Sequence, residues 1–317
     1  MKLMREKVLE KTGFKGPVFY REPMSRHTSY KIGGPARIFC LPQDVEDLKK
    51  ALIFSHEEGI PYYIIGNGTN LLVSDEGFEG MVIKISGVFN GFQFSGEKVI
   101  AGAGTDLCHL INQAGKQGLF GWPFAVGIPG TVAGAVVMNA GSSTLHMGQH
   151  VQKVWALDCK SLEFVEMRND DLQFQYRKSI LDSGKWVVLE VELLLQREDP
   201  DKIFLRIEDL LQRRRKVQPL NYPSAGSVFR NPDNAFAGKL IEDAGCKGWT
   251  QGGAMVSPVH ANFIVNFNHA RAIDVGTLMA RVRKEVEEKF GISLEPELKI
   301  IGNWPEELEE FLRPYKG

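Results

Sequence analysis

The stretch AVGIPGTVAGAVVMNAG at residues 125–141 contains no charged residue, although 24% of the 317-residue chain is charged. Glycines stand at positions 127, 130, 134 and 141, a further glycine lies upstream at 121, and Pro129 interrupts the run. Three explanations compete: a membrane span, a buried core helix, or a backbone that must come very close to something. The surrounding sequence decides among them.

The first explanation, a membrane span, is excluded because the stretch contains residues that break a helix. No Asp, Glu, Lys or Arg occurs from Gln117 through Gln152, which is long enough in principle to cross a bilayer. Pro123, Pro129 and the repeated glycines would break such a helix, and lipid supplies no replacement hydrogen bonds. We therefore expect a protein that does not enter the membrane.

The overall composition is that of an ordinary globular protein with two or three domains. Lys plus Arg (38) nearly balance Asp plus Glu (39), so the net charge does not point to nucleic acid or to an anionic membrane surface. Any recognition of phosphate must therefore be local. The charged N-terminal stretch MKLMREKVLEKTGF lacks the apolar region of a signal peptide, which predicts a cytoplasmic location.

Metal and disulfide chemistry are not expected. The four cysteines form no CxxC pair, and the histidines show no HxH or HExxH spacing. We expect reduced thiols and no metal site; the cysteines are Cys40, Cys108, Cys159 and Cys246.

Hydrophobic periodicity predicts alternating helices and strands. Residues 42–61 have the acids, apolar spacing and Gly–Pro ending of an amphipathic helix, which is followed by strand, loop and strand, a small α/β unit. Residues 151–196 alternate as an antiparallel sheet, and 199–219 and 273–291 read as helices. Residues 292–302 predict a final strand with Glu297 opposite its apolar row.

The segment IIGNGTN at 64–70 places two glycines and small polar residues directly after a strand. Consecutive backbone N–H groups can form a concave anion nest there, although a plain tight turn is an equal alternative. It is not a dinucleotide-binding GxGxxG loop, because Leu71 stands where the third glycine is needed, and the chain has no P-loop.

The opening stretch offers a second nest of the same kind. Glycines 127, 130 and 134 remove Cβ atoms, and the Thr131 hydroxyl and the Asn139 amide are available as donors. A close-packed glycine-rich core element is the alternative. Two such charge-poor loops in one chain suggest a ligand with more than one phosphate, such as a dinucleotide cofactor.

Three further stretches carry polar groups of catalytic type. They are QFQYRKSI with Tyr176 and Arg177, YPSAGSVFRNP with Ser227, and the basic run RRRK at 213–216. Taken singly, the first two are typical of surface strands and turns, and the basic run is typical of a solvated helix end. The functional alternative for the basic run is a clamp for an anionic substrate.

Taken together, these stretches resemble the UDP-N-acetylenolpyruvoylglucosamine reductases of bacterial cell-wall synthesis, and the resemblance spans nearly the whole chain. Seven motifs occur in the family's order with similar spacing: HTSYKIGGPARIFCLP, IIGNGTNLLVSDEGFEGMVI, VGIPGTVAGAVVMNAG, YRKSI, PSAGSVFRNP, HANFIVN and LEPELKIIG. One such motif would be weak; seven in register are specific.

The resemblance implies an α+β protein. A two-subdomain FAD-binding module of the PCMH, or vanillyl-alcohol oxidase, type (residues 1–85 and 86–203) would precede a C-terminal α+β substrate-binding domain (residues 204–317). It also implies FAD contacts by Gly66, Asn67, Gly68, Thr69, Asn70, Leu71, Gly127, Gly130, Thr131, Gly134, Asn139 and Gly141.

The implied reaction is the reduction of UDP-N-acetylglucosamine enolpyruvate to UDP-N-acetylmuramate. NADPH would reduce FAD and leave, and hydride from the flavin N5 would then reach the vinyl CH₂ of the UDP-sugar. Arg177 would stabilise the resulting enolate, Ser227 would protonate it, and Glu297 would act with Arg177 at the substrate carboxylate.

The resemblance also assigns substrate contacts to Tyr176, Arg215 and Asn231. The short interval between Arg177 and Ser227 leaves no room for the extra tyrosine-bearing loop of the enteric enzymes, so the chain resembles the shorter, type II form. We expect a monomer whose only partners are its small-molecule substrates.

Two other functions are weighed against this one. Another FAD-linked oxidase or dehydrogenase of the same superfamily often carries a histidine for covalent flavin attachment beside the phosphate loop, and IIGNGTN has none. A non-catalytic flavin- or nucleotide-sugar-binding module would leave the co-occurrence of Arg177, Ser227 and Glu297 unexplained.

Overall fold

The computed structural model describes residues 9–312, and its internal contacts divide the chain into two units. Unit 1 comprises the N-terminal part up to Glu22, Arg37–Gly66 and Glu79–Glu208; unit 2 comprises Pro23–Ala36, Asn67–Phe78 and the chain from Asp209 onward. Unit 2 therefore includes two early excursions of the chain that the sequence did not predict. The further division of the first part at residue 85 stays a prediction.

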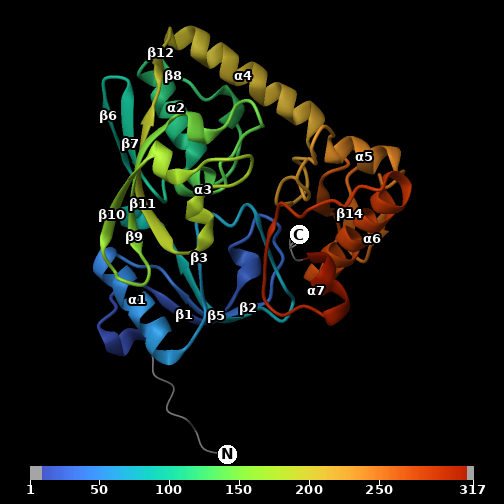
Figure 1. Cartoon of the computed structure of the whole chain (residues 1–317), viewed down its shortest axis with the longest axis horizontal. Helices are drawn as coiled ribbons and strands as arrows, with labels where there is room; N and C mark the ends of the chain where they lie inside the picture. The colour runs from blue at the N-terminus through green and yellow to red at the C-terminus, as the bar shows by residue number, and fades with distance from the viewer. Residues whose placement is uncertain (1–8, 313–317) are drawn as a thin grey trace, which may run out of the picture. The chain divides into compact units, whose positions relative to one another are not determined.

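The first layer of unit 1 is a four-stranded sheet with α1 (Val45–Glu58) (Figure 1). Its strand order is β1 (Val18–Pro23), β2 (Pro35–Cys40), β5 (Phe78–Lys84) and β3 (Tyr62–Ile65), with β3 parallel to β5. The Asp44 carboxylate accepts the N–H of Asp47 at the helix start, and left-handed Gly59 ends the helix. The predicted α/β unit is confirmed.

The second layer of unit 1 is a five-stranded antiparallel sheet. Its order is β10 (Phe164–Arg168), β9 (Val151–Asp158), β11 (Trp186–Leu194), β7 (Lys98–Gly102) and β6 (Phe92–Ser95). The helix α3 (Val132–Val137) packs on β7 and β11, and α2 (Leu107–Lys116) packs on β8 (Leu119–Phe120), which pairs with β12 (Gln196–Arg197) (Figure 1). The predicted antiparallel sheet is confirmed.

The opening stretch is mostly loop. Of residues 125–141 only the short α3 is an α-helix, and it begins at Thr131, whose Oγ1 accepts the N–H of Gly134 at 3.1 Å. Within residues 9–312 no helix combines the length and the apolar character that crossing a bilayer requires. The long helix α4 (Pro200–Val217) confirms the prediction for residues 199–219, and the division between the two units falls inside it.

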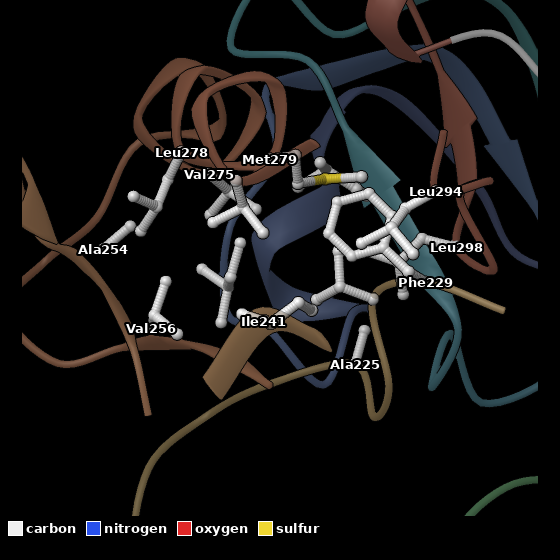
Figure 2. Close-up of a cluster of buried hydrophobic side chains, with 14 of the residues drawn as sticks. Ala225, Phe229, Ile241, Ala254, Val256, Val275, Leu278, Met279, Leu294 and Leu298 are labelled. Atoms are coloured by element: carbon white, nitrogen blue, oxygen red, sulfur yellow. The ribbon is translucent and has the colours of Figure 1, made fainter. Parts of the chain in front are cut away.

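Unit 2 is built on α6 (Ala272–Phe290), which packs against the sheet β13 (Thr250–Gln251), β14 (Ala254–Val256) and β15 (Ile264–Asn266) and against α5 (Ala237–Asp243) and α7 (Glu306–Leu312). Its core gathers Val275, Leu278 and Met279 of α6 with Phe229, Leu294 and other buried side chains (Figure 2). Val282 and Val286 of the same helix are buried as well, whereas Phe290 at its end, predicted from the apolar spacing to share this face, is 40% exposed.

The first turn of α6 is capped by a residue distant in sequence. The carboxylate of Asp75 accepts the N–H groups of Ala272 at 2.8 Å and Ile273 at 2.9 Å. An anionic cap is favourable there because the first N–H groups of a helix have no partner within it. This cap ties the excursion 67–78 to the C-terminal part of unit 2.

The predicted final strand is shorter than expected. Only β16 (Lys299–Ile301) is a strand, and it pairs in parallel with β4 (Leu71–Val73). Residues 292–298 have the apolar period of a strand but form a loop, in which Pro296 makes an isolated bridge to Phe229. Proline has no N–H to donate to a ladder, so the regular pairing cannot extend through it.

Candidate functional site

The two glycine-rich loops meet in unit 1. A Cβ atom built on Gly66 would lie 2.5 Å from Thr131 Oγ1 and 2.8 Å from Thr131 Cγ2, and one built on Gly134 would lie 3.3 Å from the same hydroxyl. The turn after β3 therefore lies directly against the start of α3. Any side chain at position 66 would push the two loops apart.

The backbone of the second loop also needs glycine for its own conformation. Gly127 has φ +75° and Gly130 has φ +130°, values that side-chain-bearing residues rarely adopt. Gly141, which bridges to His146, has φ +140° and needs glycine in the same way, whereas Gly134 is exposed within α3. Glycine at 127, 130 and 141 is thus demanded by the fold, in addition to any ligand contact.

The rest of the first loop belongs to unit 2. The carbonyl of Gly68 accepts the N–H of Ser29 at 3.1 Å, and buried Leu71 starts β4 opposite Lys299. Asn70 is bonded twice to this part of the chain: its Nδ2 donates to the carbonyl of Glu297 at 3.1 Å and its carbonyl accepts from Lys299. Asn67 is exposed and Thr69 is half-buried. The predicted cofactor loop is therefore bonded to the segment that bears Glu297.

Asn139 is bonded to the protein's own backbone. Its side chain is 1% exposed, Nδ2 donates to the carbonyl of Gln175 at 2.7 Å, and Oδ1 accepts the N–H of Gly148 at 2.8 Å. Nδ1 of His146 lies 3.0 Å from the same oxygen. The side chain therefore holds the protein's own loops, and its contact with a cofactor stays a prediction.

Arg177 lies at the tip of a tight turn that Asn139 holds. Gln175 and Lys178 exchange backbone hydrogen bonds of 2.9 and 3.1 Å, so Tyr176 and Arg177 are the two residues between them. Arg177 is half-buried, has a left-handed φ of +55°, and its guanidinium lies 5.7 Å from the Tyr176 ring centroid. A non-glycine residue in this conformation is uncommon and is frequently functional.

Ser227 lies in unit 2 beside Glu297. The N–H of Glu297 donates to the carbonyl of Val228 at 2.8 Å, and the N–H of Arg230 donates to the carbonyl of Glu295 at 2.9 Å. The segments 227–230 and 295–297 thus run side by side, and both Ser227 and Glu297 are half-buried. The structure brings these two predicted catalytic residues into adjoining segments.

The three predicted substrate contacts are divided between the two units: Tyr176 belongs to unit 1, and Arg215 and Asn231 belong to unit 2. Asn231 is exposed, and its Oδ1 accepts the N–H of Ala237 at 3.0 Å at the start of α5. Arg215 and its neighbour Lys216 are exposed in the last turn of α4, where basic groups suit the helix dipole. Tyr176 shares the turn with Arg177 in unit 1.

Sequence reasoning missed Asn262. It stands in the motif HANFIVN, yet no role had been assigned to it. The structure buries it to 4% exposure and bonds it to both backbone groups of Phe229, two residues after Ser227. An amide between apolar residues in a strand pattern was the one signal that could have indicated this.

Burial suppresses ionisation at several groups. It lowers the pKa of His146, His150 and His260, so these imidazoles favour the neutral form, and it raises the pKa of the Cys246 thiol to about 11. Within residues 9–312, no cluster of three or more His, Cys, Asp or Glu side chains could hold a metal ion. Among the predicted catalytic residues, Arg177 contributes the guanidinium group, which has donors only.

Two family models match two different parts of the chain. Residues 36–162 match a family model described as "FAD binding domain", and residues 218–301 match "UDP-N-acetylenolpyruvoylglucosamine reductase, C-terminal domain". The two matches fall on the parts of the chain that carry the glycine loops and Ser227, respectively.

The chain also resembles whole proteins. It is 46% identical over 287 residues to the UDP-N-acetylenolpyruvoylglucosamine reductase of Caldanaerobacter subterraneus subsp. tengcongensis, covering 90% of this chain and 94% of that one. It is 43% identical over 301 residues to the reductase of Alkaliphilus oremlandii, covering 95% and 99%.

A solved structure supports the same relationship. The crystal structure of the UDP-N-acetylenolpyruvylglucosamine reductase from Thermus caldophilus matches with a TM-score of 0.77 and 36% identity, over 92% of this chain and 99% of that one. The α+β fold expected from the sequence, an FAD-binding part followed by a reductase-specific part, is confirmed. The chain belongs to the UDP-N-acetylenolpyruvoylglucosamine reductase family.

Proposed function

We propose that this protein is an FAD-dependent oxidoreductase that reduces UDP-N-acetylglucosamine enolpyruvate to UDP-N-acetylmuramate with NADPH, a step in making peptidoglycan precursors. The observation that carries the proposal is the pairing of segment 227–230 with segment 295–297, so that Ser227 and Glu297 lie on adjoining segments in the part of the chain that matches the reductase-specific model. Reductases of this name cover nearly all of the chain.

The glycine loops fit a cofactor with a diphosphate. The close approach of Gly66 to Thr131 presents backbone where a Cβ would otherwise stand, and uncharged backbone donors suit phosphate oxygens. Residues 66–71 and 127–134 would hold FAD, with Gly141 at the end of the second loop. When bound, FAD supplies the hydride that it receives from NADPH.

Ser227 is proposed to deliver the proton that completes the reduction. Its hydroxyl is a poor acid in water, so its effect depends on being held at the carbon to be protonated and on the high basicity of an enolate. The bonded, half-buried segment on which it lies gives it the required fixed position.

Arg177 and Glu297 are proposed to act at the substrate carboxylate. A guanidinium stabilises the negative charge that develops there, and a preorganised charge is most effective where water is excluded. The left-handed turn at Arg177 is a cost to the fold that a positioned cation would explain. Glu297 would align the arginine or bond the carboxylate as an acid.

We also propose the finer assignments. The short interval between Arg177 and Ser227 supports the type II form, which lacks the tyrosine-bearing loop. The protein would work as a monomer in the cytoplasm, where NADPH and UDP-sugars are found. Tyr176, Arg215 and Asn231 would contact substrate, with Asn231 acting from the start of α5.

Purification and turnover test the proposal. We expect a yellow protein that releases FAD on denaturation and that, under anaerobic conditions, oxidises more than one NADPH per flavin only when the UDP-sugar enolpyruvyl ether is present. UDP-N-acetylmuramate should appear in equal amount. A preparation that cannot be loaded with FAD would contradict the proposal. So would a preparation that turns over an alcohol or a sugar lactone instead.

A further inference from the structure

The loop that carries Ser227 is held by the side chain of one buried residue. Oδ1 of Asn262 accepts the N–H of Phe229 at 3.0 Å, and Nδ2 of Asn262 donates to the carbonyl of Phe229 at 2.8 Å. The backbone carbonyl of Asn262 accepts the N–H of Val228 at 2.9 Å. Asn262 thus satisfies this edge of the loop as a neighbouring β-strand would.

The opposite edge of the same loop is bonded to the segment of Glu297. The carbonyl of Val228 accepts from Glu297, and Phe229 forms a bridge with Pro296. The Phe229 side chain is 2% exposed and lies in the unit 2 core beside Leu294 and Leu298 (Figure 2). Loop 227–230 is therefore hydrogen-bonded along both edges, and the Phe229 side chain fixes it to the core of unit 2.

We propose that Asn262 is a positioning residue for catalysis: it fixes the loop that presents Ser227 and, through Val228, its register against Glu297. The inference rests on the proposed function, because it takes Ser227 as the proton donor. A weak acid such as a serine hydroxyl gains most from exact placement, and misplacement by about 1 Å costs on the order of 10² in rate.

Asparagine suits this task for a chemical reason. Its side chain offers one acceptor and one donor group at the spacing of a peptide unit, so it pairs with both backbone groups of Phe229. Leucine has a similar size but would leave a buried N–H and a buried carbonyl without these partners. Aspartate would keep the acceptor and place a carboxylate against the Phe229 carbonyl.

Asn266 provides a matched control in the same unit. Its Nδ2 donates to the carbonyl of Tyr30 at 3.1 Å and its Oδ1 accepts the N–H of Ala270 at 2.8 Å. It therefore makes the same two kinds of bond, four residues further along the chain, to loops that do not include Ser227. Asn266→Leu reports the general effect of losing such an amide.

The experiment compares Asn262→Leu with Asn266→Leu in the FAD-loaded enzyme by anaerobic stopped flow. Flavin bleaching by NADPH and flavin reoxidation by the UDP-sugar are followed separately at the flavin absorbance. For Asn262→Leu we expect bleaching within about twofold of the parent and reoxidation slower by on the order of 10²-fold. For Asn266→Leu we expect both steps within about threefold of the parent at a comparable loss of thermal stability.

A double variant separates positioning from general damage. If Asn262 acts through Ser227, then Asn262→Leu should slow reoxidation no further when Ser227→Ala is already present. Should Asn262→Leu fail to fold, Asn262→Asp, which retains the acceptor, is used in the same cycle.

Three results would overturn the inference: equal slowing of bleaching and reoxidation by Asn262→Leu, additive effects in the double variant, or equal slowing of reoxidation by Asn266→Leu. Failure of the proposed function looks different, because Ser227→Ala alone would then leave reoxidation at the parental rate, and a catalytic role for Asn262 would fall with it.

Discussion

At the scale of single residues, several side chains expected to meet ligands are used to hold other functional residues. Asn139 bonds the turn that presents Arg177, and Asn70 bonds the carbonyl of Glu297. A side-chain amide can bond two backbone groups at once, because it offers both an acceptor and a donor. These two amides therefore fix backbone segments next to predicted catalytic residues.

For Ser227 we expect the substitution Ser227→Ala to separate the two half-reactions. Flavin reduction by NADPH should stay near the parental rate, while reduction of the UDP-sugar should slow by roughly 10² to 10⁴ or more, as loss of a positioned proton donor predicts. Single-turnover absorbance measurements check this. Equal damage to both half-reactions would show that Ser227 is structural.

Asn139→Ala should damage the Arg177 turn rather than the cofactor loops directly. The buried N–H of Gly148 would lose its partner, which costs about 1–3 kcal/mol of unfolding free energy, and the carbonyl of Gln175 would keep only its bond from the N–H of Lys178. We expect a lower midpoint in urea unfolding and a raised KM for the UDP-sugar. An unchanged KM together with weakened FAD binding would instead support a direct cofactor contact.

At the scale of elements, position 66 requires glycine because the turn after β3 lies against the start of α3. The strand β3 ends at Ile65, and the helix α3 begins with a cap by the Thr131 hydroxyl. The glycine thus allows a strand end and a helix start to touch. Neither element alone would require it.

We expect Gly66→Ala to lower stability and FAD content together, because its Cβ would meet Thr131 Oγ1 at 2.5 Å. The cost should be about 1–3 kcal/mol, as for overpacked sites. The double variant Gly66→Ala/Thr131→Ala should lose less stability than the two single variants added together, because Thr131→Ala removes the two nearest atoms, although it also removes the α3 cap, and leaves the Thr131 Cβ at 3.3 Å. Flavin-to-protein absorbance ratios and thermal melts measure both effects; fully additive losses in the double variant would refute the steric explanation.

At the scale of the whole molecule, buried neutral histidines make stability depend on pH. Burial lowers the folded-state pKa of His150 in unit 1 and of His260 in unit 2 below the ordinary value of about 6.5. The unfolded chain therefore binds more protons than the folded chain as pH falls through this range. Linkage then requires that stability is present above about pH 6.5 and is lost as pH falls below it.

We expect the free energy of unfolding in urea to fall between pH 7.5 and pH 5.5, and His260→Gln to weaken this dependence. Measurements at constant ionic strength in both proteins check it. A free energy that is flat over this range, or one that rises on acidification, would contradict the assignment of buried neutral imidazoles.

Local pattern was enough to predict much of this protein. Helices α1, α4 and α6 follow from apolar spacing and, for α1 and α6, from caps that lie next to them in sequence, such as Asp44, Gly59 and Gly291. Seven motifs in order were enough to predict the reductase family and its cofactor. These features depend on neighbours along the chain or on residue identity, so the sequence alone determined them.

Only the tertiary structure decided the rest. The strand expected over 292–302 ends up as the short β16, the excursions 23–36 and 67–78 join unit 2, and Asn262 reaches Phe229 across 33 positions. Each of these depends on a partner distant in sequence, which no local period encodes. The sequence predicted which residues carry the chemistry; long-range hydrogen bonds and core packing decided which residues hold their segments in place.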